Sequence, residues 1–129
     1  ARDLVEQLDG MAAEKGCANR SQAVANMVRD HLVEHHGQAG HHEIAGTVTL
    51  VYDHHRRNIQ ALLTDIQHHH ENVIIATLHV HLDHHNCLEV LIVRGKAAVI
   101  RKIADELTAA KGVKHGKLTV TTTGKDLPP

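Results

Sequence analysis

The sequence predicts an α+β protein in which two short helices precede a domain with the element order βαββαβ. Apolar residues recur at helical spacing near the N-terminus, strand-like and helical stretches alternate in the rest of the chain, and a glycine- and histidine-rich stretch separates the two regions. With 129 residues, 42% of them hydrophobic, the chain can form one ordinary domain or two very small ones. One tyrosine is the only aromatic residue among Phe, Trp and Tyr, so we expect an almost wholly aliphatic core.

The N-terminal region, residues 1–34, predicts two amphipathic helices. The first covers residues 3–15 and ends at Gly16, where a left-handed C-terminal cap belongs. The second runs roughly from 20 to 34, because Asn19 can cap it and a glutamine follows three residues later. Units of fewer than about 40 residues seldom bury a sufficient core, so we expect this region to dimerise.

Residues 35–42 have the composition of a hinge, and residues 43–129 predict the second domain. We expect its elements in the order strand, helix, strand, strand, helix, strand. This order is typical of ferredoxin-like domains, in which two helices cover one face of an antiparallel sheet and leave the other face bare. The expected ranges are strand 44–52, helix 58–66, strands 73–82 and 87–94, a helix between Gly95 and Gly112, and strand 117–122.

Composition excludes several function classes. Fourteen basic and fifteen acidic residues give no bulk electrostatic argument for nucleic acid. No segment has the length of a membrane span or the apolar core of a signal peptide, so we expect a cytoplasmic protein that does not bind membranes. Cys17 and Cys87 do not form a disulfide framework, which favours thiol or metal chemistry in a reducing compartment.

A histidine and cysteine cluster is predicted on the second and third strands of the second domain. Every even position from 74 to 82 is apolar, so His79 and His81 share the opposite face. If the matching apolar set of the next strand shares the core face, His81 pairs with Cys87, His79 pairs with Glu89, and 82–86 form the loop. We expect His79, His81 and Cys87 to meet on the bare face of the sheet. The apolar sets are Ile74, Ala76, Leu78, Val80 and Leu82 on one strand and Leu88, Val90 and Ile92 on the other.

His68 is the candidate for a fourth ligand. It precedes the strand whose far end carries His79, and six residues of strand span about 20 Å, so we expect a neighbouring protomer to supply it. Three imidazoles and one thiolate suit Zn, Cu or Ni, and spacing alone does not choose among them. Glu89 lies beside Cys87, where it can orient a ligand imidazole or act as a general base.

The remaining histidines are assigned no role, because surface exposure or weak metal binding accounts for them. Cys17 is interpreted as a small packed residue.

Three segments, NRSQAV, HHHENVIIATLHVHLDHHNCLEV and KGVKHGKL, closely resemble the NikR family of nickel-responsive regulators, and the resemblance runs over essentially the whole chain. It implies a ribbon-helix-helix DNA-binding domain, an ACT-type metal-binding domain, and a homotetramer built as a dimer of dimers. It also implies one square-planar Ni(II) per chain, shared between protomers. The implied ligands are His79, His81 and Cys87 with His68 of the facing chain.

The same resemblance implies DNA contacts. Arg20 and Ser21 match phosphate contacts at the start of the second helix, where backbone N–H groups favour an anion. Arg56 and Arg57 match positions from which the metal domain touches DNA. The family's base-reading strand would precede the first residues of this chain, so base-reading residues are not assigned.

We therefore expect a nickel-dependent repressor that binds operator DNA when Ni(II) occupies an intersubunit site, with no small-molecule substrate. A nickel buffer or metallochaperone without specific DNA binding is the alternative. A metalloenzyme with Glu89 as base requires an open coordination position, which four protein ligands would close, so we do not expect an enzyme.

Overall fold

A computed structural model describes residues 1–127 of the chain, which divides into two compact units, 1–35 and 36–129. Among the described residues, no helix is long and apolar enough to cross a membrane.

The first unit contains α1 (Arg2–Glu14) and most of α2 (Arg20–Gln38). Gly16 follows α1 with φ +72°, the left-handed conformation that glycine adopts without strain. Helix α2 continues four residues beyond the predicted end at 34, so the first half of the predicted hinge 35–42 is helical.

The start of α2 is fixed by a reciprocal cap. The Gln22 N–H donates to Asn19 Oδ1 at 2.9 Å, and the Gln22 side chain accepts a hydrogen bond from the Ala18 N–H. The predicted cap is therefore confirmed.

Few apolar side chains of the first unit are buried. Ala12 and Ala23 are the buried hydrophobic residues of this unit in the described chain. Five larger apolar side chains remain exposed, as expected for a helix pair that packs against another copy. Dimerisation itself stays a prediction. The exposed residues are Leu4, Val5, Val24, Met27 and Val28.

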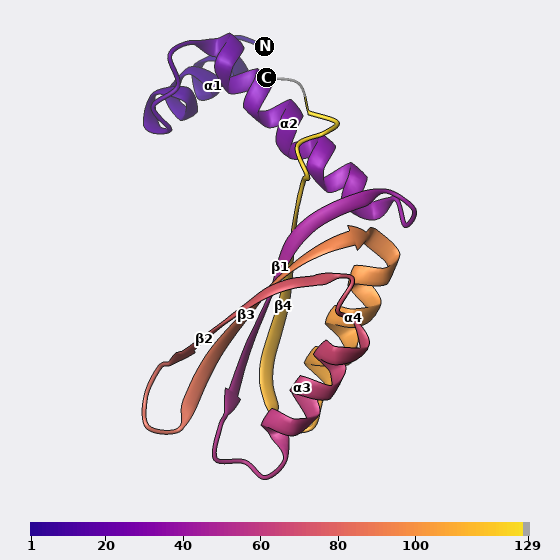
Figure 1. The fold of residues 1–129 in the computed structure, drawn as a ribbon. Helices are drawn as coiled ribbons and strands as arrows, with labels where there is room; N and C mark the ends of the chain where they lie inside the picture. Colours follow the sequence, from indigo (N-terminus) through magenta and orange to yellow (C-terminus); the bar gives the residue numbers. More distant parts are fainter. Residues whose placement is uncertain (128–129) are drawn as a thin grey trace. The chain divides into compact units, whose positions relative to one another are not determined.

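The second unit is a four-stranded antiparallel sheet with two helices (Figure 1). The order of strands across the sheet is β2-β3-β1-β4, and both helices lie on the same face. The predicted order βαββαβ and the single covered face are confirmed. The elements are β1 (Glu43–Asp53), α3 (Ile59–His69), β2 (Ile74–His81), β3 (Asn86–Lys96), α4 (Ala97–Ala109) and β4 (Val113–Thr121).

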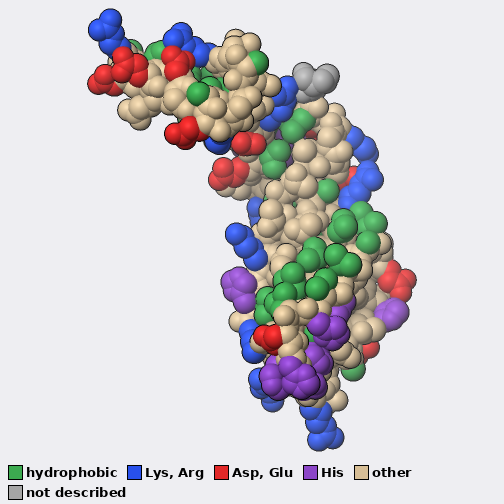
Figure 2. Space-filling model, turned by 90° about the vertical axis from the view of Figure 1, so that its left-hand side faces the viewer, with side chains coloured by type: hydrophobic (Ala, Val, Ile, Leu, Met, Phe, Trp, Pro, Cys, Tyr) green, Lys and Arg blue, Asp and Glu red, His purple; other side chains and the backbone are tan. Residues whose placement is uncertain are grey.

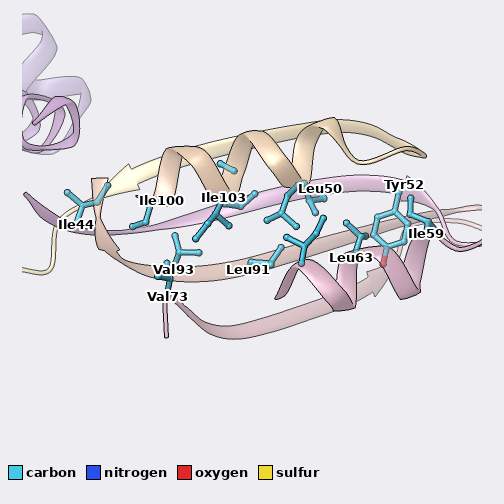
Figure 3. Close-up of a cluster of buried hydrophobic side chains, with 14 of the residues drawn as sticks. Ile44, Leu50, Tyr52, Ile59, Leu63, Val73, Leu91, Val93, Ile100 and Ile103 are labelled. Atoms are coloured by element: carbon cyan, nitrogen blue, oxygen red, sulfur yellow. The ribbon is translucent and has the colours of Figure 1, made fainter. Parts of the chain in front are cut away.

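The core lies between the sheet and the two helices (Figure 3). Alternate residues of β1 and β3 enter it, as the period of a strand requires, and meet one side of each helix. Apart from Tyr52, the side chains of this hydrophobic core are aliphatic or a thiol, as the composition predicts. The largest are Tyr52, Ile44, Leu50, Ile59, Leu63, Leu91, Ile100, Ile103 and Leu107.

The predicted assignment of faces is wrong. Leu91 and Val93 are fully buried under the helices, and Cys87 and Glu89 share their face of β3. The even positions point to the uncovered face instead, where Leu78 is 62% exposed. Alternation shows that residues share a face but not which face the helices cover, and here both faces of β3 are apolar.

Candidate metal centre

The cluster lies at the end of the sheet where β2 turns into β3. His81 pairs with Cys87 and His79 pairs with Glu89 across the antiparallel ladder. The predicted register is therefore confirmed, although the four side chains point to the helix-covered face and not to the bare face. The loop between the strands is closed by Asp83, whose Oδ1 accepts the N–H groups of His85 and Asn86.

Cys87 is the centre of the cluster. Its Sγ lies 3.4 Å from His81 Nδ1 and 3.0 Å from His54 Nδ1, and the side chain is fully buried. Ligand atoms of these three residues all lie within 4.8 Å of one another. Burial raises the pKa of the Cys87 thiol, so the free thiol is protonated near neutral pH.

His54 is a member of this group that the sequence analysis did not single out. It follows the end of β1 and has the parity of Tyr52, so its ring faces the same side of the sheet. Desolvation, followed by the neighbouring imidazoles of His55 and His81, lowers the pKa of His54. Its ring is therefore neutral near pH 7 and can accept a proton or bind a metal.

His79 lies next to the group but is held by other partners. Its ring centroid is 5.3 Å from that of His81. Its Nδ1 lies 3.2 Å from the Tyr52 hydroxyl and 3.5 Å from Glu89 Oε1, which leaves Nε2 as the second ring nitrogen for a ligand. The structure thus brings His81 and Cys87 into contact and places His79 beside them.

Glu89 connects His79 to helix α3. The Tyr52 hydroxyl donates to Glu89 Oε1 at 3.5 Å, and the Gln67 amide donates to Oε2 at 3.2 Å. Gln67 in turn accepts a hydrogen bond from the Thr77 hydroxyl at 3.2 Å. Burial, then the charges of Glu89 and Cys87, raise the pKa of Tyr52, so it stays a protonated donor.

His68 is away from this cluster within the described chain. It lies at the C-terminal end of α3, its side chain is 68% exposed, and its Nδ1 is 3.0 Å from Glu71 Oε1. It belongs to neither of the two groups of potential metal ligands that the described residues form.

The residues expected to contact DNA are exposed. The Arg20 guanidinium donates two hydrogen bonds to the Asp9 carboxylate, with nitrogen–oxygen distances of 2.6 and 2.9 Å. These hydrogen bonds lower the pKa of Asp9 and raise the pKa of Arg20, as expected for an ion pair. Ser21 is exposed in the first turn of α2.

Arg56 and Arg57 lie just before α3. Together with Lys111 they line one pocket, so three cationic side chains gather there.

The donor set of the cluster fits a borderline divalent metal, because it combines one buried thiol with two imidazoles. Figure 2 shows histidine side chains gathered at one end of the second unit, next to a run of hydrophobic side chains. A ferredoxin-like sheet that carries these potential ligands has the architecture of an ACT-like metal-binding domain. Residues 45–121 match the family described as the NikR C terminal nickel binding domain, and the chain belongs to this family of nickel-responsive regulators.

Similar proteins agree with this assignment along nearly the full chain. A protein of Geobacter sulfurreducens named a nickel-responsive regulator is 57% identical over 96% of this chain and 89% of its own length. A protein of Pyrococcus furiosus with the same name is 50% identical over 98% of this chain and 91% of its own length. The predicted membership of the family is confirmed, and so is the expectation that the chain is a regulator and not an enzyme.

Solved structures show the fold alone. The ACT domain of a GTP pyrophosphokinase from Chlorobium tepidum superposes with a TM-score of 0.51 at 12% identity, covering 60% of this chain and 86% of that domain. An uncharacterized protein of Thermotoga maritima gives a TM-score of 0.54 at 14% identity, covering 60% of this chain and 96% of its own.

Proposed function

We propose that this nickel regulator is a cytoplasmic repressor that binds operator DNA when Ni(II) occupies a site made by His79, His81 and Cys87 with His68 of a neighbouring protomer. The observation that carries the proposal is the contact between Cys87 Sγ and His81 Nδ1, with His79 two residues away on the same face. The ion, when bound, would take a thiolate and imidazole nitrogens as ligands.

The choice of His79 over His54 is supported by how each ring is held. The ladder between β2 and β3 fixes His79 and His81 on one face. The Nδ1 of His79 faces a tyrosine hydroxyl and a carboxylate, the usual arrangement of a histidine whose other nitrogen binds metal. His54 lies after the end of β1 and outside the ladder, and its Nδ1 faces the Cys87 thiol and not a carboxylate.

The uncovered face of the sheet supports assembly. Large apolar side chains of the hairpin formed by β2, β3 and their loop are exposed there, and contiguous apolar patches on a protein surface mark interaction sites. A second copy packed on this face would bury the patch. The exposed members are Leu78, Val80, Leu82 and Ile92.

Helix α3 connects the metal ligands to the basic residues. His68 is at its C-terminal end, and the preceding residue, Gln67, bonds to Glu89 behind His79. Arg56 and Arg57 lie just before its N-terminal end. Nickel bound to His68 would therefore favour one position of α3 and of the two arginines. Coupling between two sites requires that the ligand makes different contacts in the two states, and this shift of α3 would provide that difference.

The ligand set is tested with two single variants. His79→Ala removes a proposed ligand and is expected to abolish the thiolate-to-nickel charge-transfer absorption band, whereas His54→Ala should retain it. Far-ultraviolet circular dichroism of both apo proteins checks the fold. Loss of the band in His54→Ala with its retention in His79→Ala would replace His79 by His54 in the site.

Sharing of the site between protomers is tested by mixing two inactive variants. His68→Ala chains keep the three clustered ligands, and Cys87→Ala chains keep His68. Co-refolded mixtures should regain roughly a quarter of the nickel sites, because random pairing of equal amounts places the two intact halves together in about one case of four. Each variant alone, refolded identically, is the control. No recovery in the mixture, with normal assembly, contradicts a shared site.

A further inference from the structure

A second group of metal-ligand side chains lies on the loops beside the thiol cluster. Asp53 is the last residue of β1, His55 follows in the next turn, and His85 precedes β3. The two loops are tied together because the His54 N–H donates to the His85 carbonyl at 3.1 Å and because Asp53 pairs with Asn86 across the ladder. The group is therefore placed by the sheet and not by flexible segments alone.

The three side chains converge. One carboxylate oxygen of Asp53 and one ring nitrogen each of His55 and His85 lie within 4.8 Å of one another. The carboxylate is oriented by the His55 N–H, which donates to Oδ1 at 2.9 Å. The loop of His85 is oriented in the same way, because its N–H donates to Asp83 Oδ1 at 2.8 Å.

We propose that Asp53, His55 and His85 form a second metal site, which takes one borderline divalent cation such as Ni(II), Co(II) or Zn(II). Two imidazoles and a carboxylate are ligands that these ions accept, and the absence of a thiol among the three separates this site from the first. The side chains of Asp53 and His55 are 31% and 50% exposed, so water can fill the remaining coordination positions. The site should therefore bind more weakly and exchange faster than the thiolate site.

The second site has a structural consequence for the first. The ring of His55 lies 4.0 Å, centroid to centroid, from the ring of His54, which contacts Cys87. An ion that joins Asp53, His55 and His85 crosslinks the loops on either side of that contact. The proposal does not depend on nickel-dependent DNA binding, and it holds for a metal buffer as well.

The test uses the full chain already loaded with one equivalent of Ni(II), so that the charge-transfer band of the thiolate is saturated. Calorimetric titration with further Ni(II) should show one more equivalent per chain, with heat but no additional charge-transfer absorbance. Loss of a side chain that only supports a metal ligand lowers metal affinity about 10–100-fold. His85→Ala and Asp53→Asn change proposed ligands themselves, so each should weaken binding of the second equivalent at least about tenfold. The first equivalent should be unchanged.

His69→Ala is the matched control, since His69 is exposed on α3 outside both groups. It should leave both equivalents unchanged. The proposal is overturned by the absence of a second equivalent, or by a second equivalent that His85→Ala and Asp53→Asn leave intact. Equal weakening in the control would also overturn it, because the extra ion would then bind histidines nonspecifically.

Discussion

At the scale of single residues, the buried hydrogen bonds behind His79 determine how its ring can bind metal. The Glu89 carboxylate accepts hydrogen bonds from Tyr52 and Gln67, and it faces His79 Nδ1. Because the Glu89 carboxylate can only accept hydrogen bonds, a hydrogen bond between it and His79 requires the ring proton on Nδ1. The lone pair of the ring is then on Nε2. Glu89 then orients a ligand, which is the role expected for it from the sequence, and that role stays a prediction.

The thiol makes nickel binding depend on pH. Burial raises the pKa of Cys87, so the thiol must lose its proton when a metal binds at neutral pH. The logarithm of the nickel association constant should rise by about one per pH unit from near pH 7 to the raised thiol pKa. Chelator competition at a series of pH values measures this slope. If the nickel association constant does not change between pH 7 and 8, Cys87 is not a thiol that loses its proton when it binds nickel.

At the scale of elements, the β2–β3 hairpin shows what alternation predicts and what it does not. The register followed from the apolar even positions and is correct in the structure. The covered face did not follow, because Leu91 and Val93 make the odd face of β3 apolar as well. A single sequence does not say whether a helix of the same chain or another copy covers a face.

His54 shows a second limit of the sequence. It lies beyond the predicted strand 44–52, so the alternation was not extended to it, although two further residues place it on the face of Tyr52. The helical continuation of α2 to Gln38 was also not foreseen. Glycine and polar residues predict a break there, and their helix propensity is a weak guide that tertiary context overrides.

The uncovered face of the hairpin provides a prediction about assembly. Leu78 is 62% exposed on β2, and Leu78→Glu would place a charge in the proposed contact with a second copy. The dissociation constant of the oligomer should rise at least about tenfold, equivalent to about 1.4 kcal/mol. Sedimentation velocity measures it. Val99→Glu on α4, at a position that is 41% exposed, is the control and should leave assembly unchanged. Equal effects of the two variants contradict an interface at the hairpin.

At the scale of the whole molecule, two units of different kinds share one chain. The first exposes apolar helix surfaces and carries Arg20 and Ser21, and the second holds the proposed metal ligands and the basic residues before α3. Arg20 is paired with Asp9, so a phosphate would have to compete with that carboxylate for it. Membership of a nickel-responsive family agrees with a metal that controls DNA binding, and the coupling between the two units remains the central proposal.

Electrophoretic mobility shift of the full chain on operator DNA, with and without one equivalent of Ni(II) per chain, tests that proposal most directly. Allosteric coupling of about 1–3 kcal/mol corresponds to roughly 5–150-fold, and nickel should tighten DNA binding by a factor in this range. His79→Ala should bind DNA with the weak affinity of the metal-free protein at every nickel concentration. Affinity for operator DNA that is the same with and without nickel in the unaltered chain would contradict the account.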